Sequence, residues 1–252
     1  MSSMVLFEAD GHRNVLLPEA DAGEGVDTNQ HVIVDNGEAM ILDPGGTKLY
    51  TRVFASTAKE SQGARLKYVF LSHQDPDIVA SLNGWLMTTD ATGLISSLWR
   101  RFIPHFGSDQ LVYSRVEGIP DGGQRITLGK RELIVVPAHF LHSVGNFQVY
   151  DPTSKILYTG DLGVSLGEED REVKDFDAHI PLMKGFHQRY MASGKALRAW
   201  VAMVRQLDVE IIAPQHGALF RGKPMVERLL SWLEELPCGI DLLEGIYKIP
   251  PA

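Results

Sequence analysis

The sequence predicts an α/β sandwich, in which β-sheets lie inside and helices lie outside. Short apolar runs alternate with longer amphipathic stretches along the chain, and this mixture of strand and helix patterns is typical of layered α/β folds. The 252 residues are 44% hydrophobic, which is enough for a sizeable core. No low-complexity segment or Pro/Gly/Ser-rich linker divides the pattern, so we expect one domain over residues 1–252.

The first half of the chain begins with a hairpin signal. The apolar runs His31–Val34 and Ala39–Leu42 flank an Asn36-Gly37 pair, which is the residue pair that tight hairpin turns favour. Thr47 is expected to cap a helix that runs to about Ala58. Further strands are predicted at Lys67–Leu71 and Gly93–Ser96, and further helices at Ile78–Leu86 and Leu98–His105.

The second half repeats this alternation of strands and helices. Its apolar runs predict strands at Leu133–Val136, Phe147–Tyr150, Ile156–Tyr158 and Ile211–Ala213. Helical periodicity predicts helices at Tyr190–Leu207 and Pro224–Leu236, the second of which Pro237 ends.

The charge and the cysteine content narrow the class of protein. The formal net charge of −8 argues against nucleic acid or an anionic membrane as a main partner. Cys238 is the single cysteine, so no internal disulfide can form, which suits a reducing cytoplasm. The N-terminus lacks the pattern of a signal peptide, and no apolar run approaches the roughly 20 residues that span a bilayer. We therefore expect a cytoplasmic protein.

The segment from Ser72 to Asp77 is the strongest candidate for chemistry. His73, Asp75 and Asp77 follow an apolar run and occupy alternate positions. Alternate side chains of an extended backbone face the same way, and Pro76 favours extended geometry at the residue before it. These three side chains can therefore begin a metal site. The same segment is equally compatible with a polar turn in which Asp77 caps the next helix.

Three other predicted strands also end in a side chain that can bind metal. The strand at 133–136 leads into His139 and His142, the strand at 156–158 leads to Asp161, and the strand at 211–213 leads to His216. Functional groups of α/β sheets lie in the loops at strand ends. Any one of these residues alone is more often a capping or hydrogen-bonded side chain, but four such signals in order indicate one shared site.

This set of motifs resembles the metallo-β-lactamase superfamily, whose pattern is H-x-[HED]-x-D followed by H, D and H. The resemblance extends from Asn29 to about Leu236 and implies a four-layer αββα sandwich with metals at one edge. The hydrolytic branch usually carries H-x-H-x-D-H. This sequence has Asp75 in place of the second histidine and Ile78 in place of the last, which resembles the flavodiiron branch.

The resemblance also implies a ligand set. His73, Asp75 and His142 would hold one metal, Asp77 and His216 would hold the other, and Asp161 would bridge both. His142 is chosen over His139 because the Leu-His pair resembles the corresponding flavodiiron segment. His139 is then a supporting or structural residue, and Tyr190 is a candidate hydrogen-bond donor near the metals. The remaining histidines are read as structural, with His187 a candidate to orient a ligand: His12, His31, His105, His179 and His187.

The carboxylate-rich set suits two iron ions, although manganese or zinc remains compatible with it. Iron could bind dioxygen or another diatomic such as nitric oxide and supply electrons to it, whereas zinc could only activate water. Stretches at 29–46, 186–191 and 213–217 resemble stand-alone oxygen-binding di-iron proteins. About 35 residues follow Gly217, too few for a flavodoxin-like domain, so no FMN is expected in this chain.

The leading hypothesis is therefore a di-iron protein that acts as an oxygen sensor or as a terminal oxidase or reductase with an external electron donor. Turnover would require a separate redox protein, and sensing would require a signalling partner. The alternative is a dinuclear zinc hydrolase of the metallo-β-lactamase superfamily. A homodimer is expected because two-fold dimers are the commonest oligomers. Buried core is expected for the aromatic side chains that could otherwise line the site, namely Trp85, Phe140, Phe186 and Tyr190.

Overall fold

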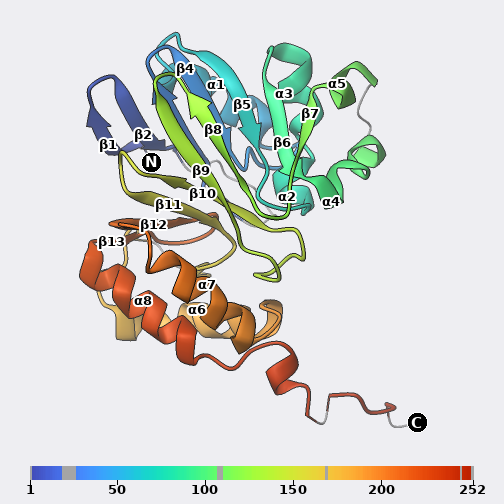
Figure 1. Cartoon of the computed structure of the whole chain (residues 1–252), viewed down its shortest axis with the longest axis vertical. Coiled ribbons are helices and arrows are strands. Elements are labelled where there is room, and N and C mark those ends of the chain that lie inside the picture. The colour runs from blue at the N-terminus through green and yellow to red at the C-terminus, as the bar shows by residue number, and fades with distance from the viewer. Residues whose placement is uncertain (1, 19–26, 107–109, 168–169, 245, 251–252) are drawn as a thin grey trace.

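The computed structural model describes residues 2–18, 27–106, 110–167, 170–244 and 246–250. Two β-sheets, of seven and six strands, pack against each other, and helices cover the outer face of each sheet (Figure 1). This arrangement is the predicted αββα sandwich.

The seven-stranded sheet contains the N-terminal half of the chain, in the order β1 to β7. Strands β1 to β4 form antiparallel pairs, whereas β4, β5, β6 and β7 run parallel. Parallel strands bring their carboxyl ends to one edge of the sheet, where loops can carry functional residues. The strands are β1 (Met4–Ala9), β2 (His12–Leu16), β3 (His31–Asp35), β4 (Glu38–Leu42), β5 (Arg65–Phe70), β6 (Thr92–Ser96) and β7 (Val116–Ile119).

The six-stranded sheet has the order β13-β12-β11-β10-β9-β8. Its strands pair antiparallel except for β11 and β12, which run parallel. The strands are β8 (Gln124–Leu128), β9 (Arg131–Pro137), β10 (Phe147–Asp151), β11 (Ile156–Gly160), β12 (Ile211–Pro214) and β13 (Phe220–Arg221).

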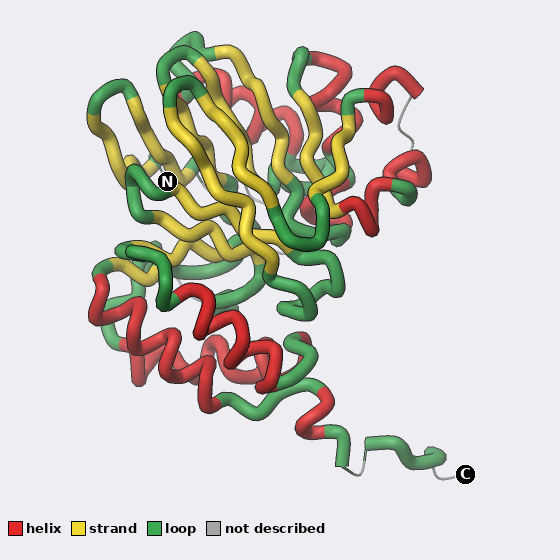
Figure 2. Tube along the Cα trace, in the orientation of Figure 1, coloured by secondary structure: helices red, strands yellow, loops and turns green. Residues whose placement is uncertain are grey.

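The helices divide between the two outer faces (Figure 2). Those of the first half are α1 (Tyr50–Glu60), α2 (Pro76–Val79), α3 (Leu82–Thr88), α4 (Ser97–Arg100), the 3₁₀ helix η1 (Ile103–Phe106) and α5 (Gln110–Ser114). Those of the second half are α6 (Phe176–Tyr190), α7 (Gly194–Val204), α8 (Lys223–Glu235) and η2 (Ile240–Leu242).

Three apolar cores separate the four layers, and the alternation of side chains along the strands explains them. Met40 and Leu42 of β4 belong to the core between the sheets, whereas Ile41 belongs to the core beneath the N-terminal helices. In the same way, Ile211 of β12 faces the core between the sheets and Ile212 faces the core beneath α6, α7 and α8. Because both faces of each sheet are buried, these strands read as continuous apolar runs in the sequence.

The predicted strands are confirmed, with ends that move by one or two residues. Several helix predictions are wrong. The helix expected at Tyr190–Leu207 is observed over a shorter range as α7 (Gly194–Val204), because Tyr190 ends α6 and the Ser193 side chain caps α7 by accepting from the backbone N–H of Ala196. Thr47 does not cap α1, which begins at Tyr50 after Leu49.

Two other predicted helices are each two shorter segments. Ile78–Leu86 spans α2 and α3, which separate at Ala80 and Ser81, and Leu98–His105 spans α4 and η1. The Ser96 side chain caps α4 by accepting from the backbone N–H of Leu98. Strands β1, β2, β7, β8 and β13 and helices α5 and α6 were not predicted from the sequence, because the apolar runs there are short or mixed with polar residues.

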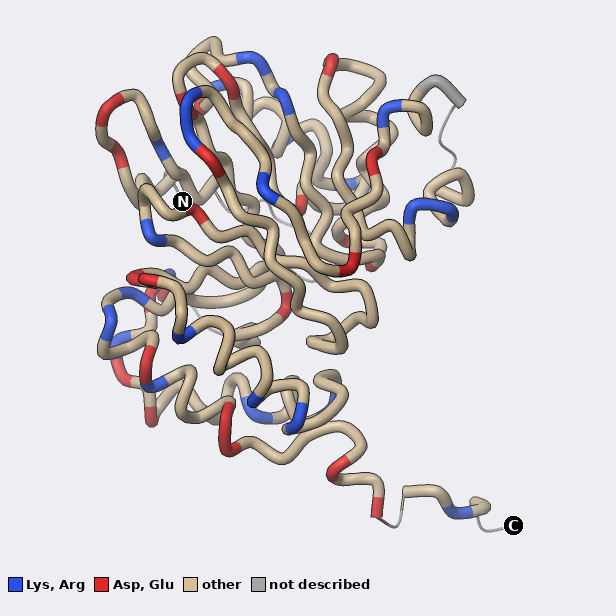
Figure 3. The backbone as a smooth tube through the Cα atoms, viewed as in Figure 1, with Lys and Arg blue, Asp and Glu red and all other residues tan. Residues whose placement is uncertain are grey.

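Charged residues of both signs are interspersed along the chain (Figure 3). Within the described residues, no helix has the length and apolar character that crossing a membrane requires.

Candidate metal centre

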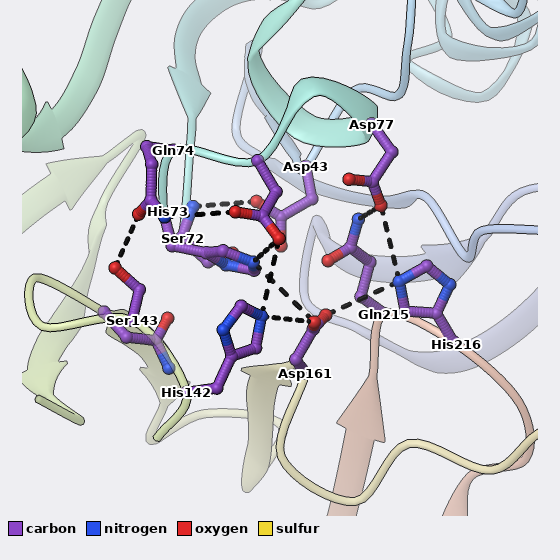
Figure 4. Close-up of polar contacts among 12 residues, drawn as sticks. Asp43, Ser72, His73, Gln74, Asp77, His142, Ser143, Asp161, Gln215 and His216 are labelled. Atoms are coloured by element: carbon purple, nitrogen blue, oxygen red, sulfur yellow. Dashed lines mark hydrogen bonds and ion pairs between the residues drawn. The ribbon is translucent and has the colours of Figure 1, made fainter. Parts of the chain in front are cut away.

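Six side chains that can bind metal meet at one edge of the sandwich (Figure 4). Each lies in a loop or helix start just after a strand, as the sequence predicted. The segment after β5 supplies His73, Asp75 and Asp77, the loop after β9 supplies His142, and the ends of β11 and β12 supply Asp161 and His216. The strand ends therefore bring together residues that are far apart in the sequence.

One cluster contains His73, Asp75, His142 and Asp161. One nitrogen or oxygen atom of each residue lies within 4.8 Å of those of the others. Oδ2 of Asp75 is 3.6 Å from Nε2 of His73 and 3.5 Å from Nε2 of His142. Oδ2 of Asp161 is 2.8 Å from Nε2 of His142 and 3.7 Å from Nε2 of His73. These atoms surround a volume that one cation could occupy.

A second cluster lies on the other side of Asp161. Nε2 of His216 is 3.4 Å from Oδ2 of Asp77 and 3.5 Å from Oδ1 of Asp161. Asp161 therefore presents one carboxylate oxygen to each cluster. A carboxylate in this orientation is suited to bridge two metal ions.

Opposite charges dominate the electrostatics of these clusters. Burial alone would raise the pKa of Asp161, but His142, His216 and His73 outweigh it and hold that pKa well below its usual range. Burial would lower the pKa of His216, but Asp161 and Asp77 raise it to about 10. Burial would likewise lower the pKa of His73, but Asp75 and Asp161 raise it. Metal binding requires neutral imidazoles, so a cation would compete with protons for His73 and His216.

Two polar atoms at the centre lack a partner among the described residues, and a metal ion could supply one. Nε2 of His73 and Oδ1 of Asp161 are buried and have no hydrogen-bond partner. An unpaired buried polar atom costs roughly 1–3 kcal/mol, and two cations, one in each cluster, would supply the missing partners and remove that cost. The mixed imidazole and carboxylate donor set suits iron, manganese or zinc. The residues present therefore fit a pair of such ions.

Groups behind the histidines fix which ring nitrogen faces the centre. The carbonyl of Asp27 lies 2.7 Å from Nδ1 of His216, and the hydroxyl of Ser72 lies 2.9 Å from Nδ1 of His73. In both rings Nε2 is thus left for the site, an arrangement common among metal-binding histidines. Gly217 has a positive φ of 80°, and a Cβ there would lie 2.0 Å from the Ser165 hydroxyl, so the His216 loop requires glycine.

His139 lies apart from the clusters. Its Nε2 is 2.8 Å from the carbonyl of Asp121, and its ring packs edge-on against Phe147. These contacts give His139 a structural role in the loop after β9.

His187 is buried, and its Nε2 accepts from the backbone N–H of Gly163, two residues after Asp161. It therefore supports the Asp161 loop without facing the centre.

The aromatic residues near the site only partly follow the expectation of buried core. Trp85 is buried, but Phe140 and Tyr190 are about half exposed, with 50% and 54% of their surface accessible. The Tyr190 ring stacks on Phe186 and lies 5.6 Å from the His142 ring. Phe186 and Tyr190 thus line the rim of the site, because α6 ends beside the loop that carries His142.

Several polar residues of the site were not assigned a role from the sequence. Asp43 accepts from the backbone N–H of Ser72, and burial raises the pKa of Asp43 to about 6. Gln215 donates from Nε2 to Oδ2 of Asp77 at 3.2 Å, and Gln74 donates to Asp75. The two glutamines are sequence neighbours of proposed ligands, and that adjacency is the signal that could have identified them.

The family of the chain follows from comparison with known proteins. Residues 26–217 match the family described as ODP family beta lactamase. This chain belongs to that family. The site described above therefore lies in a protein of the ODP family.

Solved structures of relatives agree with the fold. The chain is 40% identical to the "chemotaxis sensor ODP", covering 98% of this chain, both in a structure described as a peroxy diiron species (TM-score 0.87, 100% of that chain) and in an apo structure from T. denticola (TM-score 0.86, 99% of that chain). Rubredoxin oxygen:oxidoreductase from Desulfovibrio gigas has the same fold at 16% identity, with a TM-score of 0.77 over 92% of this chain and 61% of that chain.

A curated relative is longer than this chain. The uncharacterized protein MJ0732 of Methanocaldococcus jannaschii is 22% identical over 221 residues, which cover 81% of this chain and 52% of that protein. The chain thus spans about half the length of this relative.

Proposed function

We propose that this member of the ODP family is a di-iron protein that binds dioxygen and acts as an oxygen sensor. The observation that carries the proposal is the position of Asp161, whose two oxygens face two separate clusters of histidine and aspartate. The 40% identity to a chemotaxis sensor with a described peroxy diiron species supports iron and dioxygen rather than zinc and water. The cofactors are two iron ions.

In this proposal the six side chains divide between the two ions. His73, Asp75 and His142 would hold one ion, Asp77 and His216 would hold the other, and Asp161 would contribute to both. Two ferrous ions can together supply two electrons to a bound diatomic ligand. The protein orients the imidazoles through Ser72 and Asp27, as described above, and the neighbouring histidines hold the pKa of Asp161 well below its usual range.

Access to the site favours a small ligand. Phe186 and Tyr190 lie at the rim beside His142, so their rings limit the room for a larger molecule. The Tyr190 ring lies beside the His142 ring, and we propose that its phenol donates a hydrogen bond to the bound diatomic ligand. A sensor also needs a partner, and we propose a separate signalling protein for this role, with a cytoplasmic homodimer as the working form.

Purification under anaerobic conditions without added metal tests this proposal. We expect two iron ions per chain by metal analysis, and a near-ultraviolet absorption band that appears in air and disappears on reduction. A matched sample loaded with zinc should show no such band. Zinc as the resident metal, together with ester hydrolysis proportional to zinc content, would instead support the alternative of a dinuclear hydrolase.

A further inference from the structure

A chain of three hydrogen bonds connects Asp75 to the helix α4. The indole Nε1 of Trp99 donates to Oγ of Ser143 at 3.2 Å, and Oγ of Ser143 donates to Oε1 of Gln74 at 2.5 Å. Nε2 of Gln74 then donates to Oδ1 of Asp75 at 3.1 Å. Trp99 lies on α4, Ser143 follows His142, and Gln74 lies between His73 and Asp75, so these hydrogen bonds link three separate segments. Figure 4 shows the contact between Ser143 and Gln74.

The direction of every bond in this chain is fixed by chemistry. An indole N–H can only donate, so Ser143 accepts from Trp99 and must direct its single proton elsewhere. That proton goes to Gln74, which makes Oε1 the acceptor and turns the amide Nε2 toward Asp75. A reversed amide would put Oε1 beside the carboxylate and leave Ser143 facing an NH₂ group. The three residues therefore have one arrangement that satisfies all of them.

The packing around the indole also favours the hydrogen bond between Trp99 and Ser143. A Cβ at Gly145 would lie 2.8 Å from Nε1 of Trp99 and 2.7 Å from Oγ of Ser96. Glycine at this position thus allows the loop after β9 to approach α4 closely enough for Ser143 to reach the indole. Ser143 itself is buried, with 5% of its surface accessible, so water competes little for its hydroxyl.

As a consequence, the two carboxylate oxygens of Asp75 have different partners. Oδ1 is held by Gln74, whereas Oδ2 faces Nε2 of His73 and Nε2 of His142. At the other end of this series of hydrogen bonds, the Trp99 ring packs against the Phe102 ring, with 5.6 Å between the ring centroids. Leu98 and Phe102 are both exposed. A displacement of Asp75 would therefore be transmitted to a surface segment through Trp99.

We propose that Trp99, Ser143 and Gln74 form a positioning relay, which presents Oδ2 of Asp75 to the metal and couples the state of that ligand to the surface of α4. The relay rests on the proposed function, because it assumes that Asp75 is a metal ligand. None of the three residues is itself proposed to touch the metal. In an oxygen sensor, such a relay is a route by which a change at the site reaches a surface that a partner can read.

Nuclear magnetic resonance of the indole N–H groups tests the relay with zinc as a diamagnetic probe. The chain contains four tryptophans, and the Trp99→Phe variant identifies the Trp99 signal by its loss. We expect the Trp99 signal to move when Zn²⁺ is added to the 252-residue protein. The signal of Trp85, whose Nε1 is buried without a hydrogen-bond partner, should move less and serves as the internal reference.

Two further variants separate the relay from simple proximity to the metal. Ser143→Ala and Gln74→Leu each break the chain but leave Trp99 in place, so the zinc-dependent movement of its signal should be lost. Gln74→Leu should also weaken zinc binding by about 10–100-fold, the usual effect of removing a group that orients a ligand. Folding of each variant is checked by the dispersion of the remaining signals.

The outcomes distinguish the two proposals. If wild-type protein binds zinc but the Trp99 signal stays still, or moves equally in Ser143→Ala, the relay is overturned and the metal site survives. If wild-type protein binds no metal, both proposals are overturned.

Discussion

At the scale of single residues, Asp161 has the most demanding position in the site. It is buried, it faces His142 and His73 through Oδ2, and it faces His216 through Oδ1. Its ionised state depends on these neighbouring histidines, which lower its pKa, because burial by itself opposes that state. A substitution here should therefore disturb both clusters at once.

The Asp161→Asn variant tests this dependence. Asparagine keeps the size of the side chain but removes its charge and replaces one acceptor oxygen with an NH₂ group, so it cannot bridge two cations. We expect bound iron to fall from two ions per chain to one or fewer, measured by metal analysis after anaerobic loading and desalting. The control is His139→Ala, which should retain both ions, since His139 contacts Asp121 and Phe147 rather than the site. An equal loss of metal from the two variants would show that the ligands are misassigned.

At the scale of elements, α6 connects the C-terminal layer to the rim of the site. The helix begins at an Asp175 N-cap, whose Oδ1 accepts from the backbone N–H groups of Asp177 and Ala178, and it ends at Tyr190. A capping carboxylate satisfies N–H groups that have no partner within the helix, and its charge also favours the helix N-terminus. The position of Phe186 and Tyr190 beside His142 thus depends on a helix that its cap stabilises.

Removal of this cap should lower the stability of the protein moderately. We expect Asp175→Ala to reduce the free energy of unfolding by about 1 kcal/mol, measured by urea denaturation of metal-loaded protein. Asp175→Asn is the matched control, because its amide oxygen is also a good capping acceptor, and it should cost a few tenths of a kcal/mol at most. If alanine and asparagine had the same effect, the cap would not contribute to the stability of α6.

At the scale of the whole molecule, a buried ionic cluster joins the two sheets. His12 of β2 lies between two carboxylates, with Nδ1 3.0 Å from Oδ1 of Asp35 and Nε2 2.6 Å from Oδ2 of Asp151. Asp35 belongs to β3 and Asp151 to β10, so the imidazole bridges the seven-stranded and six-stranded sheets. All three side chains are fully buried.

The cluster predicts a dependence of stability on pH. Burial would lower the pKa of His12, but Asp151 and Asp35 outweigh it and raise that pKa. A raised pKa in the folded state means that the contribution of His12 is complete below its ordinary pKa of about 6.5. That contribution is lost as the pH rises through the folded-state pKa. The pKa of Asp151 is lowered, so its contribution is lost only at acidic pH.

We expect His12→Gln to lower the free energy of unfolding by about 3–5 kcal/mol near neutral pH, as is usual when one partner of a buried ion pair is removed. The difference from wild type should shrink as the pH is raised from 7 to 10. Urea denaturation of metal-loaded protein over this range measures this difference. The control is His12→Gln/Asp151→Asn, which removes the charges of His12 and Asp151 and leaves Asp35. A difference that stayed constant with pH would show that His12 is neutral in the folded protein.

The resemblance to the metallo-β-lactamase superfamily implied the four-layer αββα class and the choice of His142 over His139. The residue pattern by itself predicted the main strands, an α/β sandwich and candidate ligands at the strand ends. These are visible because a strand buried on both faces must be a continuous apolar run, and because the ligands follow such runs directly. His73, Asp75 and Asp77, for example, could be proposed together from their alternate spacing after β5. The single domain and the homodimer remain predictions.

Only the tertiary structure decided how those residues meet and what supports them. The opposite orientation of the two oxygens of Asp161, the chain from Trp99 to Asp75, and the cluster around His12 all join segments that are distant in sequence. The break between α2 and α3 also involves a distant segment, because the Ser81 hydroxyl donates to the carbonyl of Gly45. Local pattern and propensity describe neighbours along the chain, whereas these contacts depend on the packing of whole layers, which brings strand ends and loops to a common edge.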